Sequence, residues 1–264
     1  MADTDSLRGQ RILITGASMG IGAAIARAFA RQGAELLLVA RSEEKLRLVL
    51  SEIAPHSPGS AYVTADLTRP EEVENLVQRI LLDGRLDGIV HNAGAGHYGT
   101  FSSTSEQDLR GLFELNFFSV FTLTRGLLPL LKRSPRATVL TVSSVVAWRA
   151  IPRMAVYSAT KACISAFVES LRIDLAPEGI RVVDVYPGRT RTDFSANAKS
   201  TGWRPFSTEF QGASPEKVAA KILRAYVKGK RDEFVSLSNR LLIWGNFLFP
   251  GIIDWGMKRY FRDK

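Results

Sequence analysis

Several features that would place a chain of 264 residues in a specialised class are missing from this sequence. It has one cysteine, Cys163, so no internal disulfide can form, and we interpret this cysteine as an inert helix residue. The three histidines are scattered and form no Cys/His cluster with the spacing of a metal site. No apolar run reaches the roughly eighteen residues that a membrane span needs. These absences favour a globular protein without a metal centre.

The amino terminus and the charge distribution narrow the class further. The segment MADTDSLRGQ carries two acids and no apolar stretch, so we expect neither a secretory signal nor a transit peptide, and a cytoplasmic location. The formal net charge of +9 suits anionic partners such as nucleic acid, acidic lipid or a phosphorylated cofactor. The basic residues are scattered, without a basic arm or an aromatic RNA-binding signature, so we expect no nucleic-acid partner.

Length and composition predict one α/β domain over residues 1–264. With 45% hydrophobic residues the chain can bury one substantial core. Short strand-like runs alternate with helix-like runs, which implies right-handed crossovers and a parallel, doubly wound sheet flanked by helices. The strand-like runs are RILIT (11–15), AELLLVA (34–40), AYVTAD (61–66), LDGIVHN (86–92), RATVLTVSS (136–144) and GIRVVDVY (179–186).

Glycine or polar residues follow these runs at the edge where parallel sheets bind ligands. Gly16, Arg41, Asp66, Asn92 and Ser144 each come at the end of a strand-like run. Since ligands of open parallel sheets bind at the carboxyl ends of the strands, we expect these five residues to face one ligand site.

The first of these ends carries a glycine-rich turn. Gly16, Gly20 and Gly22 allow a tight turn, a close approach to a phosphate and close packing of the next helix. The spacing, Gly-x-x-x-Gly-x-Gly, differs from the commonest dinucleotide fingerprint, but the strand before it and the helix after it are the expected context. We therefore predict a dinucleotide whose pyrophosphate faces the helix N-terminus.

The second strand end indicates which dinucleotide. NAD sites usually place an acid there to hold the ribose hydroxyls, whereas this chain has Ala40 followed by Arg41 and Ser42. A guanidinium binds a 2′-phosphate in a bidentate way, so NADPH is favoured over NADH.

A serine, a tyrosine and a lysine have spacings that suit carbonyl chemistry. Tyr157 and Lys161 are four apart on a predicted helix face, and Ser144 lies thirteen residues before the tyrosine. A tyrosine has a pKa near 10, and moving it to roughly 7 needs about 4 kcal/mol of differential stabilisation of the phenolate. Lys161 and an oxidised nicotinamide favour the phenolate, and Ser144 can hold a developing alkoxide. An isolated Tyr-x-x-x-Lys is common on amphipathic helices, so the assignment depends on the other motifs.

Taken together, the motifs show a family resemblance that covers roughly residues 8–235. The chain resembles a classical short-chain dehydrogenase/reductase, a single-domain, Rossmann-type fold. The motifs that carry the resemblance, in the family's order, are TGASMGIG (15–22), Asp66, HNAG (91–94), Asn116, Ser144, Tyr157, Lys161 and PGRTRT (187–192).

The resemblance implies a role for each site residue. Tyr157 would be the general acid/base, Ser144 would polarise the carbonyl, and Lys161 would hold the nicotinamide ribose and lower the tyrosine pKa. Asn116 would position a water in a proton relay; the alternative is a helix residue satisfied by a water or a backbone carbonyl. The expected cofactor-binding residues are Gly16, Ser18, Gly20, Ile21, Gly22, Arg41, Ser42, Asp66, Leu67, Asn92, Ala93, Gly94, Tyr157, Lys161, Pro187, Gly188, Thr190 and Thr192.

Two positions depart from the family pattern. His91 replaces a common asparagine that usually braces strands, which affects local hydrogen bonding more than chemistry. Met19 stands where many NADPH-dependent members have a basic residue, so phosphate recognition would depend on Arg41. His56 and His97 fall in predicted loops, and we interpret both as structural or solvent-exposed.

The predicted activity is reduction of a ketone or aldehyde by hydride from NADPH, with the proton from Tyr157. An NAD-linked alcohol dehydrogenase and a non-catalytic NADP-sensing protein are the alternatives. Family members usually pair through the long helices that here span about 105–132 and 156–176, so we expect a homodimer or homotetramer.

The substrate and the carboxyl terminus are less determined. Trp203, Phe206 and Phe210, in a loop near 193–215, either line an apolar pocket or cover the sheet edge. After one more helix and an edge strand, the tail from about 236 to 264 mixes aromatic, aliphatic and basic residues, broken by Gly245, Pro250 and Gly251. We favour packing on protein, at a subunit interface or the pocket mouth, over contact with a membrane surface. An apolar lipid, acyl or steroid-like substrate is the accompanying hypothesis.

Overall fold

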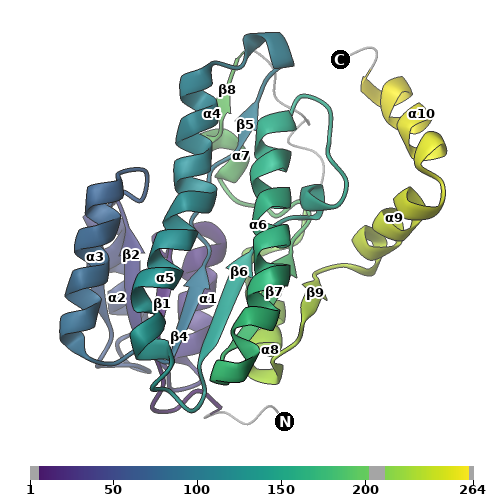
Figure 1. Cartoon of the computed structure of the whole chain (residues 1–264). Coiled ribbons are helices and arrows are strands. Elements are labelled where there is room, and N and C mark those ends of the chain that lie inside the picture. The colour runs from purple at the N-terminus through teal and green to yellow at the C-terminus, as the bar shows by residue number, and fades with distance from the viewer. Residues whose placement is uncertain (1–5, 202–211, 262–264) are drawn as a thin grey trace.

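A computed structural model describes residues 6–201 and 212–261 of the chain. Seven strands form one sheet in the order β3-β2-β1-β4-β6-β7-β9, and every pair in it is parallel (Figure 1). The predicted doubly wound parallel sheet is therefore confirmed. The strands are β1 (Arg11–Thr15), β2 (Glu35–Ala40), β3 (Ala61–Thr64), β4 (Gly88–His91), β6 (Thr138–Val142), β7 (Arg181–Tyr186) and β9 (Asp232–Phe234).

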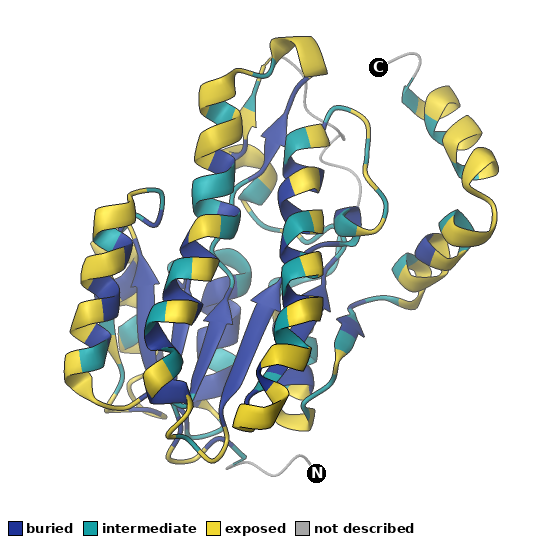
Figure 2. Ribbon diagram, viewed as in Figure 1, coloured by how far each residue is buried: buried dark blue, intermediate teal, exposed yellow. Residues whose placement is uncertain are grey.

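Helices cover both faces of this sheet, which is why its central strands are nearly continuous apolar runs. One buried cluster joins α1 (Gly20–Ala30), α2 (Glu43–Ile53) and α8 (Pro215–Lys228) to the sheet. The other cluster joins α3 (Pro70–Asp83), α5 (Ser119–Leu131) and α6 (Ala155–Asp174) to the opposite face. Figure 2 shows the buried sheet between helices whose outer sides are exposed.

The strand order reverses between β1 and β4. Ile14 of β1 pairs with Leu38 of β2 on one side and with Val90 of β4 on the other. The chain winds outward from this point in both directions, so crossover helices leave a crevice between the two carboxyl ends. This crevice is the site that the sequence predicts for a ligand.

The predicted long helix over 105–132 is interrupted. It consists of α4 (Glu106–Phe113), one π-helical turn, η2 (Glu114–Phe118), and α5. The extra residue of a π turn shifts the face on which following side chains lie, and such turns are frequent at functional sites. Here the turn contains Asn116.

Short elements surround the carboxyl edge of the sheet. A small parallel pair, β5 (His97–Tyr98) and β8 (Lys199–Ser200), brings two loops together. The other short elements are the 3₁₀ turns η1 (Phe101–Ser103), η3 (Val145–Ala147) and η4 (Ala176–Glu178), and the helix α7 (Phe194–Asn197).

The carboxyl terminus forms two helices that extend from the body: α9 (Leu237–Leu248) and α10 (Pro250–Phe261) (Figure 1). The expected break at Pro250 is present, because α9 ends at Leu248 and α10 begins at Pro250, whereas Gly245 and Gly251 lie inside the helices and interrupt neither. Proline is accepted at the start of α10 because the first turn needs no backbone donor. Among residues 6–201 and 212–261, no helix is long and apolar enough to cross a membrane.

Candidate active site

The glycine turn between β1 and α1 forms a cradle that no side chain could enter. Gly16 and Gly20 adopt positive φ values of 65° and 56°, where other residues are strained. A Cβ on Gly16 would lie 2.8 Å from the Cα of Ala93, and one on Gly22 would lie 2.1 Å from the Gly16 carbonyl oxygen. The first turn of α1 has no side-chain cap and no acid. Backbone and helix dipole are thus arranged to accept a pyrophosphate.

Asn92, at the end of β4, holds this turn in place. Its Nδ2 donates to the carbonyl oxygens of Thr15 at 3.0 Å and Gly16 at 3.2 Å. The backbone N–H groups of Asn92 and Ala93 both donate to Thr15 Oγ1. The two strand ends at the switch point are therefore joined by hydrogen bonds, which keeps the cradle rigid. Ser18 and Ile21, within the turn, are half-buried.

The ends of β2 and β3 place one acid near one exposed arginine. Burial alone would raise the pKa of Asp66, but hydrogen bonds from Thr68 and the charges of Arg41 and Arg69 outweigh it and lower the pKa. Asp66 therefore remains an ionised acceptor at neutral pH. Ser42 caps α2 by accepting from the Lys45 N–H, and Leu67 is buried in the core, so a cofactor could reach Leu67 only through its backbone.

Ser144, Tyr157 and Lys161 meet at the carboxyl ends of β6 and β7. Ser144 caps η3 two residues after β6 by accepting from the Val146 N–H at 3.3 Å. Its hydroxyl lies close enough to Tyr157, in the first turn of α6, to act on the pKa of the phenol. One turn along α6, Lys161 places its Nζ 5.9 Å from the centroid of the tyrosine ring. All three residues are buried. The spacing in the sequence thus does bring the three side chains together.

The pKa of Tyr157 moves in the direction opposite to the one expected. Burial raises it, and the nearby Ser144 hydroxyl lowers it by less. The Lys161 ammonium instead donates to the carbonyl oxygen of Val142 at 2.9 Å. Without a bound cofactor the raised pKa thus keeps Tyr157 protonated at neutral pH.

Lys161 has a buried acid behind it that the sequence analysis missed. Burial lowers the pKa of Lys161 to about 8, and the charge of Asp184 raises it. Asp184 accepts hydrogen bonds from Thr141 Oγ1 at 2.7 Å and from Ser165 Oγ at 3.0 Å. Burial raises the pKa of Asp184 itself to about 6. The sequence signal that could have identified Asp184 is an acidic residue inside the otherwise apolar strand run VVDV.

Asn116 is buried, and both amide protons are engaged. Its Nδ2 donates to the Ala95 carbonyl oxygen and to Thr160 Oγ1, each at 3.0 Å, while its Oδ1 accepts from the Ala95 N–H at 2.9 Å. A Cβ on Gly94 would lie 3.3 Å from Asn116 Oδ1 and 3.5 Å from Lys161 Nζ. Asn116 therefore fixes the loop after β4 next to Lys161. This agrees with the alternative interpretation, in which a backbone carbonyl satisfies the Asn116 amide. Its role in a water relay stays a prediction.

The loop after β7 closes over the glycine turn. Pro187 accepts a hydrogen bond from the Val145 N–H, which joins this loop to the one that carries Ser144. A Cβ on Gly20 would lie 3.2 Å from the methyl carbon of Thr192, so these two loops are in contact. Thr190 Oγ1 donates to the Gly188 carbonyl oxygen at 3.2 Å. Four strand ends thus surround one crevice.

The three histidines have separate environments. The ring of His91 is buried, shares a 2.9 Å hydrogen bond with Thr124 Oγ1 and has its pKa lowered by burial to about 3, so it is neutral. His91, which replaces the family's common asparagine, thus still has a hydrogen-bond partner. His97 is not in a loop: it is buried in β5, with its Nε2 3.9 Å from Asp108 Oδ2. His56 is exposed in a turn.

An apolar cluster surrounds the ring of Tyr157. Tyr98, Val146, Met154 and Ala198 are buried against it, and Phe194 packs on the ring with centroids 5.6 Å apart. These side chains make the described surroundings of the phenol ring apolar. Trp203, Phe206 and Phe210, predicted as pocket or edge residues, lie outside the described residues.

No other described feature competes for the chemistry. A surface hollow of about 460 Å³, lined in part by Arg8, Gly33 and His56, lies at the amino ends of the strands, opposite Tyr157. Within the part of the chain that the structure describes, no group of three His, Cys, Asp or Glu side chains could hold a metal ion.

A glycine cradle at the switch point of a parallel sheet, joined to a buried Ser-Tyr-Lys set, defines a nucleotide-dependent oxidoreductase of the α/β class. The family model for short chain dehydrogenase matches residues 10–202. The chain belongs to the short-chain dehydrogenase/reductase family, and it is an NAD(P)-dependent oxidoreductase.

Individual relatives are similar over most of the chain. An 11-beta-hydroxysteroid dehydrogenase-like protein 4A of Arabidopsis thaliana is 32% identical, over 97% of this chain and 86% of its own. The solved structure of a short-chain dehydrogenase from Sphingobium yanoikuyae in complex with NADPH has a TM-score of 0.80 and 27% identity, covering 93% of this chain and 95% of its own. A 3-ketoacyl-(acyl-carrier-protein) reductase from Brucella melitensis, complexed with NADH, has a TM-score of 0.77 and 27% identity, covering 87% and 97%.

Proposed function

We propose that this protein is an NADPH-dependent reductase that interconverts a carbonyl and an alcohol on an apolar substrate. The observation that carries the proposal is the buried set of Ser144, Tyr157 and Lys161, with the lysine ammonium 5.9 Å from the centroid of the tyrosine ring, at the crevice edge next to the glycine cradle. A carbonyl oxygen between the two hydroxyls would be polarised by Ser144 and protonated by Tyr157.

The residues divide the work by position. When NADPH is bound, the hydride would come from its nicotinamide, and the residues of this chain would hold the cofactor and move the proton. The cradle holds the pyrophosphate, and Asn92 keeps the cradle rigid. Lys161, charged below a pKa of about 8, is placed to hold the nicotinamide ribose and to favour the phenolate that forms as Tyr157 gives up its proton. Asn116 fixes the adjoining loop, so the lysine keeps its position.

NADPH is favoured because of Arg41. Its side chain is exposed after β2, close enough to Asp66 for its charge to act on that carboxyl, and Ala40 leaves no acid to repel a 2′-phosphate. The similar structures hold NADPH in one case and NADH in another, so the preference depends on this residue. Arg41→Ala should lower kcat/KM for NADPH roughly 10- to 100-fold, the loss of a charged hydrogen-bonding partner, and leave NADH unchanged. Arg69→Ala, a second arginine near Asp66, is the matched control.

The apolar substrate is supported by the cluster around Tyr157. Val146, Met154 and Phe194 surround the hydroxyl with hydrocarbon, which favours a lipid, acyl or steroid-like ketone over a small polar one. The similar Arabidopsis protein is named hydroxysteroid dehydrogenase-like, which is in keeping with such a substrate.

The test is oxidation of NADPH and NADH against carbonyls that range from small aldehydes to long-chain and steroid ketones. Tyr157→Phe should reduce turnover by about 10²- to 10⁴-fold with NADPH affinity nearly unchanged, because only the proton donor is removed. Tyr62→Phe, which removes the same hydroxyl from the edge strand β3, should keep the turnover of the wild type. Wild-type turnover in Tyr157→Phe would overturn the assignment.

Two other outcomes separate the alternatives. Tight NADPH binding with no turnover of any carbonyl would favour a cofactor-sensing protein. Higher kcat/KM with NAD⁺ and alcohols than with NADPH and ketones would favour an NAD-linked alcohol dehydrogenase.

We also propose that the protein is a cytoplasmic homodimer or homotetramer, with a functional core over about 8–235 and a separate tail from about 236. Phe118, Phe121 and Ile173 are exposed on the long helices expected to pair subunits. Light scattering on the purified chain tests the assembly; a monomer at micromolar concentration would refute it.

A further inference from the structure

Residues 237–261, which we call the C-terminal arm, touch the body through a few polar and aromatic contacts. Arg149 donates to Asn246 Oδ1 at 3.1 Å and pairs with Asp254 at 2.6 Å. The rings of Trp148 and Phe247 are 6.0 Å apart, in an edge-on arrangement. A Cβ on Gly188 would lie 2.2 Å from Asn239 Nδ2, so α9 begins against the loop that closes the crevice.

The arm has its apolar side turned outward. Ile243 is its one buried residue, and the polar groups of Asn246 and Asp254 contact the body. Trp244 is 59% exposed and Trp255 is 66% exposed. The further exposed apolar residues are Leu237, Leu241, Leu242, Phe247, Leu248, Phe249, Ile252 and Tyr260. So many exposed large apolar side chains on one segment of the chain mark an interaction site.

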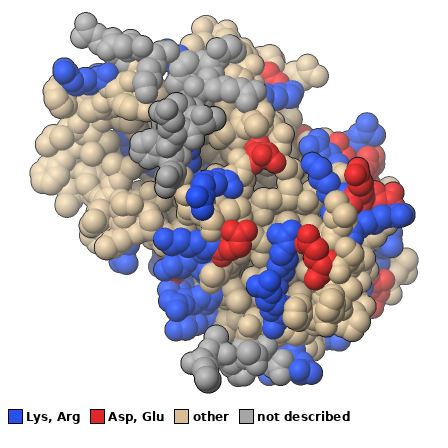
Figure 3. Space-filling model, turned by 180° about the vertical axis from the view of Figure 1, so that it is seen from behind, with Lys and Arg blue, Asp and Glu red and all other residues tan. Residues whose placement is uncertain are grey.

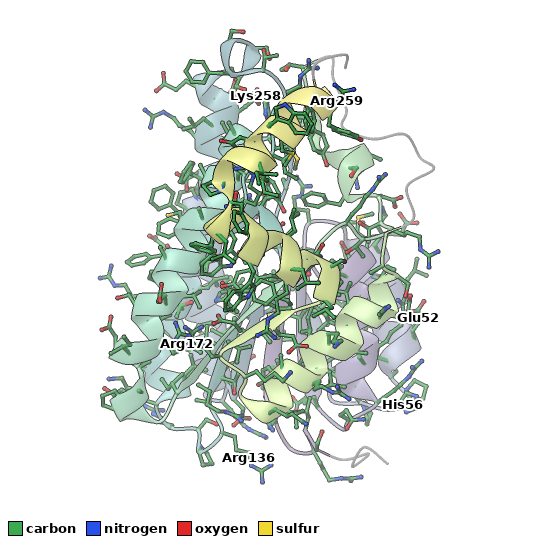
Figure 4. The ribbon with its side chains drawn as sticks, turned by 90° about the vertical axis from the view of Figure 1, so that its right-hand side faces the viewer. Glu52, His56, Arg136, Arg172, Lys258 and Arg259 are labelled. Carbon is green, nitrogen blue, oxygen red and sulfur yellow. The ribbon has the colours of Figure 1, made fainter. Side chains whose placement is uncertain are left out.

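The charge of the arm indicates what covers this surface. The arm carries three basic residues, Arg240, Lys258 and Arg259, and one acidic residue, Asp254. Asp254 is paired with Arg149 of the body. Figure 4 shows Lys258 and Arg259 toward the far end of α10. In Figure 3 the side on which α9 and α10 lie, at the left, has few charged residues, while Lys and Arg gather lower on the body. Exposed Trp and Tyr with basic residues at the rim is the composition of helices that lie in a lipid interface.

A bilayer fits these features better than a second copy. Pairing of two copies through the arm would bring their Arg240, Lys258 and Arg259 together, whereas an anionic lipid surface attracts these charges. Each arm helix is 12 residues long, about half of what a span needs, so the helices would lie along the surface.

We propose that the outward face of the C-terminal arm docks on an anionic lipid bilayer and holds the mouth of the active site against it. The mouth is adjacent because α9 contacts Gly188, and Trp148 follows closely after Ser144. An apolar ketone would then enter from the bilayer. The docking is argued from the residues of the arm alone, whereas the entry of substrate rests on the proposed function.

Flotation of the full chain with phosphatidylcholine vesicles, with and without phosphatidylserine, tests the docking with no substrate or cofactor present. Wild type should float with the anionic vesicles. The double variant Trp244→Gln/Trp255→Gln should bind at least about tenfold more weakly. Leu82→Gln, which removes an apolar residue on α3 that is even more exposed, should bind as wild type. Reversal of Lys258 and Arg259 to glutamate should weaken binding about five- to tenfold for each charge and remove the preference for phosphatidylserine.

Absence of flotation by wild type, or equal flotation by the double tryptophan variant, would overturn the docking. So would a dimer that the tryptophan variant converts to monomers, because a second copy would then cover the arm. Turnover of a ketone embedded in vesicles should fall at least about tenfold in the tryptophan variant, with a soluble aldehyde turned over as before. If no carbonyl is reduced while flotation behaves as expected, the proposed function fails and the docking stands.

Discussion

The sheet body and the C-terminal arm follow opposite packing rules. In the body, apolar side chains of strands and helices are buried in two clusters, one on each face of the sheet. In the arm, most of the large apolar side chains are exposed and one residue, Ile243, is buried. Both regions are helical where the sequence allows, so helix formation alone does not distinguish them.

The difference teaches where stability and function come from. A body that buries its apolar surface is stable by itself. Because its interior is close-packed, substitution of its glycines or buried charged residues destabilises it. The arm buries little apolar surface against the body, so its contacts with the body add little stability. It can therefore detach at a small cost in free energy and bind another surface. The contrast predicts that the same kind of substitution has opposite consequences in the two regions.

The largest effect is expected for Gly22→Ala, in the body. The new Cβ would lie 2.1 Å from the Gly16 carbonyl oxygen, a backbone atom that can move only if the cradle opens. Overpacking should cost about 3 kcal/mol or more and lower the Tm by roughly 10 °C. NADPH affinity should fall with it. Calorimetry and NADPH titration check both, and a variant with wild-type Tm would show that the cradle is not rigid.

A smaller effect is expected for Asp184→Asn, which removes a buried charge while keeping the shape. Asp184 is ionised above its pKa of about 6, and its charge raises the pKa of Lys161, which burial lowers to about 8. Without that charge, Lys161 loses its proton at lower pH. The falling alkaline limb of kcat/KM for NADPH should therefore move down by about one pH unit.

The matched control for Asp184 is Ser165→Ala, which deletes one hydrogen bond to the carboxylate and leaves its charge. We expect its alkaline limb to stay near the wild-type position. If both variants show the same limb, Asp184 acts only through packing.

The smallest effect is expected for Gly256→Ala in the arm, where a Cβ meets nothing within 4 Å. Alanine should stabilise the helix by about 0.5–1 kcal/mol, seen as slower amide exchange in α10, with the Tm of the body unchanged. A rise of several degrees in Tm would mean that arm and body unfold together, which would remove the contrast between the two regions.

The strand ends were predictable from the sequence because a parallel sheet places every carboxyl end at one edge. That rule alone brings Gly16, Asp66, Asn92 and Ser144 to a common crevice. The four-residue spacing of Tyr157 and Lys161 likewise fixes their common helix face. By contrast, the π turn at Asn116 depends on how its amide meets Ala95 and Thr160, which are distant in sequence.

What the sequence determined by itself is therefore the alternation of strands and helices, the residues at the crevice and the family to which the chain belongs, because these follow from local periodicity and motif spacing. Only the tertiary structure decided the electrostatics and the free surface. The raised pKa of Tyr157 and the influence of Asp184 on Lys161 follow from burial, which depends on the packing of α6 against β7. The contacts of Arg149 with Asn246 and Asp254, and of Asn239 with Gly188, decide which side of α9 and α10 faces the body. The apolar side chains on the other side are left exposed.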